Sequence, residues 1–353
     1  MSQNALIDLV QGMDHLPVVP LLGFPGVQTT NSTVRQNMFN YGLHFRSLMN
    51  LVKRYKPDAL FMMMDLSLEI NALGGPVRYD EFAAPSVLDH MVVDEAGLES
   101  LYKINIRQDA RINAYLKTLG LMIKYFNVMP AAYVIGPFTL ASHLLGASKA
   151  AKATIKNVDF LHKVLDFTVG VIKDHAAMLT EAGAEMICVL EPSAMGVSPA
   201  SFDEFSKPYL QRIYEGFTTY SVLHICGNTT HLVENMALSG AQGLSLDRGT
   251  DLVAAAEKVS DKVVIIGNVP PVHVVLEQTP KDVYDFTVDL MHKMSPFKNF
   301  ILATGCDLPP DTPLDNIQAM MNAGCGLPLD ARPEYPDALK EDEQAILAAL
   351  EQA

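Results

Sequence analysis

The segment Tyr220-Ser-Val-Leu-His-Ile-Cys-Gly227 is an apolar run that carries a histidine and a cysteine near its end and stops at a glycine. Such a run predicts a buried β-strand, in which residues two positions apart point to the same side of the sheet. His224 and Cys226 are therefore expected to share a face. An imidazole beside a thiol is half of a binding site for a soft metal ion.

A third ligand is expected from a second run, Phe300-Ile-Leu-Ala-Thr-Gly-Cys306, which also ends in glycine and cysteine. One histidine and two cysteines suit Zn²⁺ with its fourth coordination position open to a reactant, which is typical of an enzyme. A lone His-x-Cys pair is as often part of the core, but the matching Gly-Cys favours the metal site. The fold must then bring Cys226 and Cys306 together, although they are about eighty positions apart.

The pattern of apolar runs predicts such a fold. Eight strand-like runs are separated mostly by segments with helical apolar spacing; they are residues 16–23, 59–65, 131–137, 185–192, 221–226, 243–247, 262–269 and 300–304. In an α/β chain, this number and alternation favour a closed parallel (β/α)₈ TIM barrel over an open doubly wound sheet. Insertions are expected at the N-terminus and between the second and third runs, where residues 66–128 are longer than one helix needs.

One catalytic barrel domain is expected over residues 1–327. The remaining residues, 328–353, contain Pro333 and Pro336 before a helical pattern, and predict a connector and a terminal surface helix.

The composition limits the functional classes. Hydrophobic residues make up 49% of the chain and charged residues 19%, which is typical of a globular protein. The net charge of −14 argues against nucleic acid as a partner. The start of the chain lacks the basic and apolar parts of a secretory signal, and no apolar run reaches membrane-spanning length. Four widely spaced cysteines indicate a reducing cytoplasm, where thiols stay available to metals. The oligomeric state stays open, with a homodimer as one candidate.

Barrel enzymes carry their reactive groups at the carboxyl ends of the strands. The polar residues that fall there are Asp65, Glu191, His224, Cys226, Asp247, Asn268 and Cys306. Two catalytic roles stay open for Glu191: a displaceable fourth ligand, or a carboxylate that orients His224.

The other strand-end residues have weaker assignments. Asp247 is a second catalytic candidate, and Asp65 and Asn268 are candidates for substrate binding, although acids at strand ends also cap helices. Phe24 and Phe138 at the barrel mouth suit an aromatic substrate ring, but they are equally good core residues.

Several motifs resemble the superfamily of uroporphyrinogen decarboxylases and zinc-dependent corrinoid methyltransferases. They cover nearly the whole chain to about residue 325 and lie at residues 65–74, 136–141, 198–205, 224–227 and 305–313. The resemblance implies that His224, Cys226 and Cys306 hold zinc, as in the methyltransferase branch. Decarboxylases carry an arginine-rich loop after the first strand, whereas residues 23–33 contain no arginine and Arg35 stands alone.

The methyltransferase branch implies transfer of a methyl group between a small methylated substrate and the cobalt of a corrinoid. The corrinoid is expected on a separate small protein, because the chain has no Asp-x-His-x-x-Gly cobalamin signature. The segment 23–30 resembles the demethylating members and favours an aryl methyl ether, hence O-demethylation. The alternatives are methyl transfer from the corrinoid to a thiol such as coenzyme M, and a uroporphyrinogen decarboxylase-like reaction.

Overall fold

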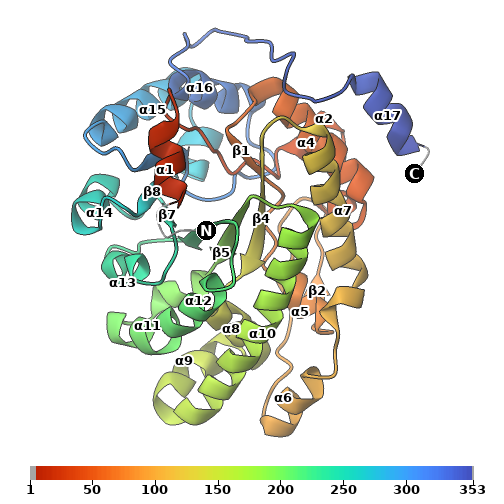
Figure 1. The fold of residues 1–353 in the computed structure, drawn as a ribbon, viewed down its shortest axis with the longest axis vertical. Helices are drawn as coiled ribbons and strands as arrows, with labels where there is room; N and C mark the ends of the chain where they lie inside the picture. Colours follow the sequence, from red (N-terminus) through yellow and green to blue (C-terminus); the bar gives the residue numbers. More distant parts are fainter. Residues whose placement is uncertain (1–4, 352–353) are drawn as a thin grey trace.

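The computed structural model describes residues 5–351, which form an α/β barrel (Figure 1). Seven parallel strands make one curved sheet in which each strand pairs with the next in the chain. They are β1 (Ala59–Phe61), β4 (Met129–Ile135), β5 (Met186–Leu190), β6 (Tyr220–Ile225), β7 (Gly243–Leu246), β8 (Val264–Val269) and β9 (Phe300–Thr304). The barrel class predicted from the sequence is confirmed. Residues 1–4 and 352–353, the outer ends of the two predicted parts of the chain, lie outside the described residues.

The first predicted strand, residues 16–23, is wrong as a strand. Val18 forms one isolated parallel bridge with Leu302 of β9 and no longer ladder. The reason is that Pro17 and Pro20 have no N–H group to donate to a neighbouring strand. The eighth position of the barrel is therefore filled by an extended segment.

Asp58, just before β1, attaches this segment on its other side. The backbone N–H of Asp58 donates to the carbonyl of Val18 (3.1 Å), and the N–H of Val18 donates to Oδ2 of Asp58 (2.7 Å). The other carboxylate oxygen of Asp58 lies 2.8 Å from Nε2 of His15. The residues around Val18 thus bond to both β9 and Asp58 and close the barrel.

Helices cover the outside of the sheet (Figure 1). The α-helices are α1 (Ala5–Gly12), α2 (Gly26–Thr29), α3 (Val34–Phe39), α4 (Tyr41–Tyr55), α5 (Leu68–Ala72), α6 (Glu95–Leu101), α7 (Ala110–Tyr125), α8 (Pro137–Leu145), α9 (Ala147–Lys156), α10 (Val158–Ala182), α11 (Pro199–Phe205), α12 (Lys207–Tyr214), α13 (Val233–Ala237), α14 (Leu252–Lys258), α15 (Pro280–Met294), α16 (Leu314–Gly324) and α17 (Glu343–Glu351). Short turns of other helix types lie at η1 (Ile106–Gln108), η2 (Pro192–Gly196) and η3 (Pro271–Leu276). No helix in the described part of the chain is both long and apolar enough to cross a membrane.

The insertion expected between β1 and β4 contains α5, the antiparallel pair β2 (Val77–Arg78) and β3 (Ser86–Val87), and α6. Helix α7 then returns the chain to β4. After α16 the chain is mostly irregular until α17, which buries Ile346 against the barrel helices. The division of the chain at residue 327 stays a prediction.

Two layers of apolar side chains fill the molecule. One cluster lies inside the barrel and includes Val222 of β6, and the other lies between the sheet and the helices and includes Leu223 and Ile225. The alternation shows that even-numbered residues of β6 point into the barrel. His224 therefore points inward.

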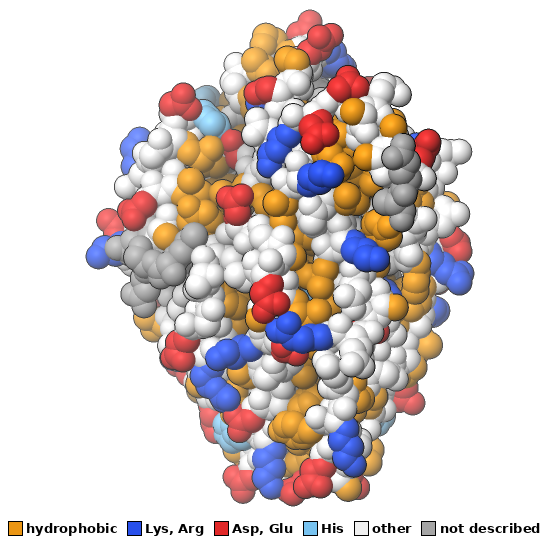
Figure 2. Space-filling model, turned by 45° about the vertical axis from the view of Figure 1, so that its right-hand side comes forward, with side chains coloured by type: hydrophobic (Ala, Val, Ile, Leu, Met, Phe, Trp, Pro, Cys, Tyr) orange, Lys and Arg blue, Asp and Glu red, His pale blue; other side chains and the backbone are white. Residues whose placement is uncertain are grey.

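The molecular surface carries charges of both signs. Figure 2 shows acidic and basic side chains interspersed on one face, with apolar patches between them. The net charge of −14 is thus not gathered into one patch on this face.

We expect Asp58→Ala to destabilise the fold. Val18 is buried at 1% exposure, so removing the carboxylate leaves its N–H without an acceptor and lowers the free energy of unfolding by about 1–3 kcal/mol. Thermal unfolding followed by circular dichroism measures the change. Asp337→Ala, which breaks only a surface ion pair with Lys56, is the control and should leave the melting temperature close to that of the wild type. Equal melting temperatures for the two variants would contradict the closure described here.

Candidate metal centre

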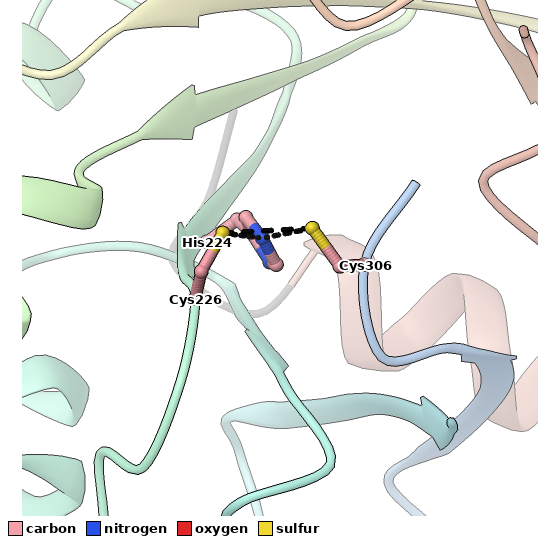
Figure 3. Close-up of side chains that lie close together, drawn as sticks. All are labelled: His224, Cys226 and Cys306. Atoms are coloured by element: carbon pink, nitrogen blue, oxygen red, sulfur yellow. Dashed lines mark hydrogen bonds between the residues drawn. The ribbon is translucent and has the colours of Figure 1, made fainter. Parts of the chain in front are cut away.

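Three potential metal ligands converge at the barrel mouth. Nε2 of His224 lies 3.0 Å from Sγ of Cys226 and 3.6 Å from Sγ of Cys306, and the two sulfurs are 3.5 Å apart. Figure 3 shows the three side chains pointing toward one another from β6 and from the turn after β9. We call these residues the His-Cys-Cys trio. No other group of three or more His, Cys, Asp or Glu side chains within residues 5–351 lies close enough to share a metal ion.

The imidazole of His224 is oriented by the neighbouring strand. In the register of β6 and β7, His224 lies opposite Ser245, and Nδ1 of the ring is 3.0 Å from the Ser245 hydroxyl oxygen. When Nδ1 carries the proton and donates to Ser245, Nε2 keeps a free lone pair directed at the sulfurs. Ser245 therefore can hold the ring in the tautomer that binds a metal.

Asp247, at the end of β7, holds the two turns that carry the cysteines. Its Oδ2 accepts a hydrogen bond from the N–H of Gly227 (2.8 Å), directly after Cys226. A Cβ atom on Gly305, directly before Cys306, would lie 2.8 Å from Oδ1 of Asp247, so only glycine allows this approach. Asp247 thus contacts the turns beside both cysteines. A catalytic role for Asp247 stays a prediction.

Asn268 supports the same region from β8. Its side-chain amide donates to the backbone carbonyls of Asp247 (3.1 Å) and Thr250 (2.8 Å). This contact stabilises the loop after β7. Substrate binding by Asn268 stays a prediction.

Glu191 is fully buried near the trio but faces another element. Its two oxygens accept hydrogen bonds from the backbone N–H groups of Phe138 (2.8 Å) and Thr139 (2.9 Å) at the start of α8. Burial outweighs these bonds and raises the pKa of Glu191 to about 7. Ser245, not Glu191, holds the ring of His224. A catalytic role for Glu191 stays a prediction.

Three further residues expected to bind substrate are already engaged or buried. Asp65 pairs with Arg111 and accepts hydrogen bonds from the backbone and hydroxyl of Ser67. Phe24 packs in the cluster inside the barrel and is 6% exposed, and Phe138 packs under the helices and is 2% exposed. Substrate binding by these three residues stays a prediction.

Sequence reasoning missed Ser245 and Asp307. Ser245 is the hydroxyl residue in an otherwise apolar strand. Its position between two leucines, which point to the opposite side of the sheet, was the sequence signal that could have indicated its role. Asp307, directly after Cys306, is partly buried, and its Oδ2 accepts a hydrogen bond from the N–H of Met64 (3.1 Å). Burial raises the pKa of the Asp307 carboxyl well above its usual range. No sequence pattern indicated that this residue would lie inside.

The donor set fits zinc. Bonds of about 2.3 Å to sulfur and about 2.0–2.1 Å to nitrogen place tetrahedral ligands roughly 3.5–3.8 Å apart. The distance between the two sulfurs (3.5 Å) and that from Nε2 of His224 to Sγ of Cys306 (3.6 Å) agree with this range. The distance from Nε2 of His224 to Sγ of Cys226 (3.0 Å) is shorter, as in a hydrogen bond. The hydrogen bond with Cys226, together with burial, raises the pKa of the Cys306 thiol. A divalent cation between the two sulfurs would reverse this effect, because it stabilises both thiolates.

Comparison with known proteins places the chain in a family. The sequence profile of the uroporphyrinogen decarboxylase (URO-D) family matches residues 10–327. The chain belongs to the uroporphyrinogen decarboxylase family. The resemblance inferred from the motifs is therefore confirmed.

Named URO-D relatives include two kinds of enzyme. Methylcobamide:CoM methyltransferase MtbA of Methanosarcina acetivorans is 27% identical over 274 residues, which are 75% of this chain and 78% of the relative. A uroporphyrinogen decarboxylase of Prochlorococcus marinus is 25% identical over 303 residues, 82% of this chain and 86% of the relative. A solved methyltransferase from Methanosarcina mazei has a TM-score of 0.81 at 24% identity, over 91% of this chain and 98% of that chain, and supports the barrel fold.

We expect Ser245→Ala to weaken zinc binding about tenfold or more, because Nδ1 of His224 loses the acceptor that fixes the ring and its tautomer. Competition with a chromophoric chelator measures the affinity. Ser221→Ala removes a buried serine from the opposite end of β6 and is the matched control, expected to bind zinc like the wild type. An unchanged affinity in Ser245→Ala would show that this hydroxyl does not orient the ligand.

Proposed function

We propose that this URO-D family member is a zinc-dependent methyltransferase that moves a methyl group from the cobalt of a protein-bound corrinoid to a thiol. The observation that carries the proposal is the convergence of one imidazole and two thiols at the barrel mouth, which leaves one position of a four-coordinate zinc to a reactant. Such a donor set is typical of catalytic zinc, whereas structural zinc sites have four protein ligands.

Zinc held by the trio would lower the pKa of a thiol substrate and keep its sulfur as a thiolate. The protein supplies the geometry. Ser245 fixes the ring of His224, and Asp247 fixes the turn that follows Cys226. These contacts keep the three ligands in place before the substrate arrives, so less ordering is required when it binds.

The methyl group passes directly from cobalt to sulfur, and no covalent intermediate forms on the enzyme. The cobalt–carbon bond of the methylated corrinoid breaks and leaves its electron pair on cobalt. The thiolate sulfur forms the new bond to the methyl carbon, and the proton of the thiol goes to solvent. The rigid barrel mouth serves to bring sulfur and methyl carbon together.

Two observations disfavour decarboxylation of a porphyrin. A substrate with many carboxylates needs several cations, and residues 23–33 at the barrel mouth contain none. Arg35, the next arginine along the chain, is paired with Glu81 at 3.2 Å. The His-Cys-Cys trio, by contrast, has an evident role in zinc-dependent methyl transfer and none in porphyrin decarboxylation.

The comparisons favour a thiol acceptor over the aryl methyl ether expected from the sequence. The methyltransferase relative is named for transfer to coenzyme M. Phe24 and Phe138, which were expected to hold an aromatic ring, are instead packed in the core. The thiol reaction, the sequence-based alternative, therefore becomes the main proposal.

The corrinoid-carrying protein is a separate partner in this proposal. The trio lies at the carboxyl ends of the strands, so this partner must approach the barrel mouth. The insertion between β1 and β4 and the start of α8 directly follow the carboxyl ends of β1 and β4 and therefore border the mouth on one side.

We expect Cys226→Ser and Cys306→Ser each to lose most bound zinc and at least about a hundredfold of methyl transfer, because an alcohol is a far poorer zinc ligand than a thiolate. Elemental analysis gives the zinc content, and the change in the visible spectrum of methylcobalamin with an added thiol gives the rate. Cys325→Ser is the matched control, since Cys325 is exposed and lies at the end of α16. Full zinc content and full transfer in both variants would refute the proposal.

A second measurement separates thiol from ether. A thiol substrate should shift the zinc X-ray absorption edge, because a third sulfur enters the coordination sphere, whereas methoxybenzene should leave the edge in place. Methoxybenzene can add no sulfur, and an edge that responds to it alone would favour the ether reaction.

A further inference from the structure

We propose that Cys226 and Cys306 join in a disulfide bond when zinc is absent, and that this bond is a redox switch which turns the metal centre off. The inference rests on the zinc site of the proposed function and adds regulation to it. It is drawn from the distance between the two sulfurs, from their place in the chain and from their access to solvent.

The two sulfurs are already in contact. Sγ of Cys226 lies 3.5 Å from Sγ of Cys306, and Figure 3 shows the two side chains directed at each other. A disulfide bond is about 2.05 Å long, so the sulfurs must approach by roughly 1.5 Å. Within residues 5–351, no hydrogen bond links Cys188 or Cys325 to another cysteine. The distance therefore selects one pair among the four cysteines of the chain.

The chain around this pair can accommodate the approach. Strand β6 ends one residue before Cys226, and β9 ends two residues before Cys306, so neither cysteine belongs to a strand ladder. Each has a glycine beside it: Gly227, which has a positive φ of 84°, and Gly305. The bond therefore requires rotation of two side chains and a small shift of two turns, and no strand pair has to break.

Solvent access favours the same pair. Cys226 and Cys306 are partly exposed at the barrel mouth, whereas Cys188 is buried in β5. Cys325 is exposed too, but it lies at the end of α16 without a contact to another cysteine. Access to a dissolved oxidant and proximity to a second thiol thus coincide only at the two metal ligands.

The oxidant is a low-molecular-weight disulfide such as oxidised glutathione. One cysteine attacks it as a thiolate, and the S–S bond of the small molecule breaks and releases one thiolate. The second cysteine attacks the resulting mixed disulfide, forms the bond between Cys226 and Cys306 and releases the second thiolate. Two protein thiols are oxidised, one small disulfide is reduced to two thiols, and these take up the two protons of the cysteines.

Zinc and the disulfide exclude each other. Zinc binds cysteine as thiolate, and a disulfide has no thiolate to offer. Oxidation removes two members of the His-Cys-Cys trio and leaves only His224, so zinc is released. Because zinc binds only the reduced form, it stabilises that form by a factor of 1 + [Zn]/Kd. The switch therefore closes the site when zinc is scarce or oxidant abundant, and a reduced thiol, the acceptor in the proposed function, opens it again.

The test uses the full chain with Cys325→Ser, because exposed Cys325 reacts with glutathione by itself. Chelator-treated protein is equilibrated with mixtures of oxidised and reduced glutathione, quenched with acid, denatured and alkylated with N-ethylmaleimide. Intact mass then counts the free thiols. We expect all three remaining cysteines to be free in reducing mixtures and only Cys188 in oxidising ones, with full recovery after dithiothreitol.

Zinc should shift this equilibrium by a known amount. The titration is repeated at two concentrations of buffered free zinc, tenfold apart and both above the Kd. The ratio of oxidised glutathione to the square of reduced glutathione at the midpoint should rise about tenfold. Zinc release, followed with a chromophoric chelator, should parallel the loss of free thiols.

Peptide mapping identifies the bond. Trypsin places Cys226 in residues 213–248 and Cys306 in residues 299–340, and Cys188 lies in residues 174–207. The first two peptides should be linked. Cys226→Ser or Cys306→Ser, each added to Cys325→Ser, should show no link between peptides.

The outcomes separate this inference from the proposed function. Three free thiols at every glutathione ratio, a link that involves Cys188, or a midpoint that zinc leaves in place would each overturn the switch. If the disulfide forms and zinc opposes it, but no thiol is methylated, the proposed function falls and the switch stands. If thiols are methylated and no disulfide forms, only the switch falls.

Discussion

The curvature of the sheet is the constraint on which the metal centre depends. Strands β6 and β9 are three positions apart in the sheet, and in a flat sheet that separation would be roughly 14 Å. Their cysteine sulfurs are 3.5 Å apart because the sheet is closed into a barrel and the parallel strands end at one mouth. Closure is completed by the extended segment around Val18, which occupies the eighth position of the barrel in place of a regular strand. The site therefore depends on the segment that lies beside β9, the strand that leads to Cys306.

Asp247 links the fold to the chemistry. One carboxylate contacts the turn after Cys226, the turn before Cys306 and the backbone of Arg248. The carboxyl group thus contacts two other turns besides its own loop, and glycine is required where the chain approaches it most closely. This arrangement explains how ligands from distant parts of the sequence keep a common geometry.

The sequence was sufficient to predict the barrel, the insertion before β4 and the three residues of the trio, since strand periodicity and the rule for strand ends determine all of them. It was insufficient wherever the direction of one side chain mattered. Glu191 was placed correctly at a strand end, yet its carboxylate faces α8 rather than His224. Ser245 was overlooked because its role depends on the register between two strands. Residues 16–23 have strand-like hydrophobicity, but two prolines prevent the ladder.

The prolines around Val18 have a further consequence for the architecture. The barrel wall consists of a continuous seven-stranded ladder and one seam, where a few single bonds replace regular pairing. Protein engineers who relocate chain ends usually avoid cutting a ladder. In this molecule the seam has the fewest interstrand bonds, but a cut there would also affect the loop of Cys306, because the N–H of Leu308 donates to the carbonyl of Leu21 (2.9 Å).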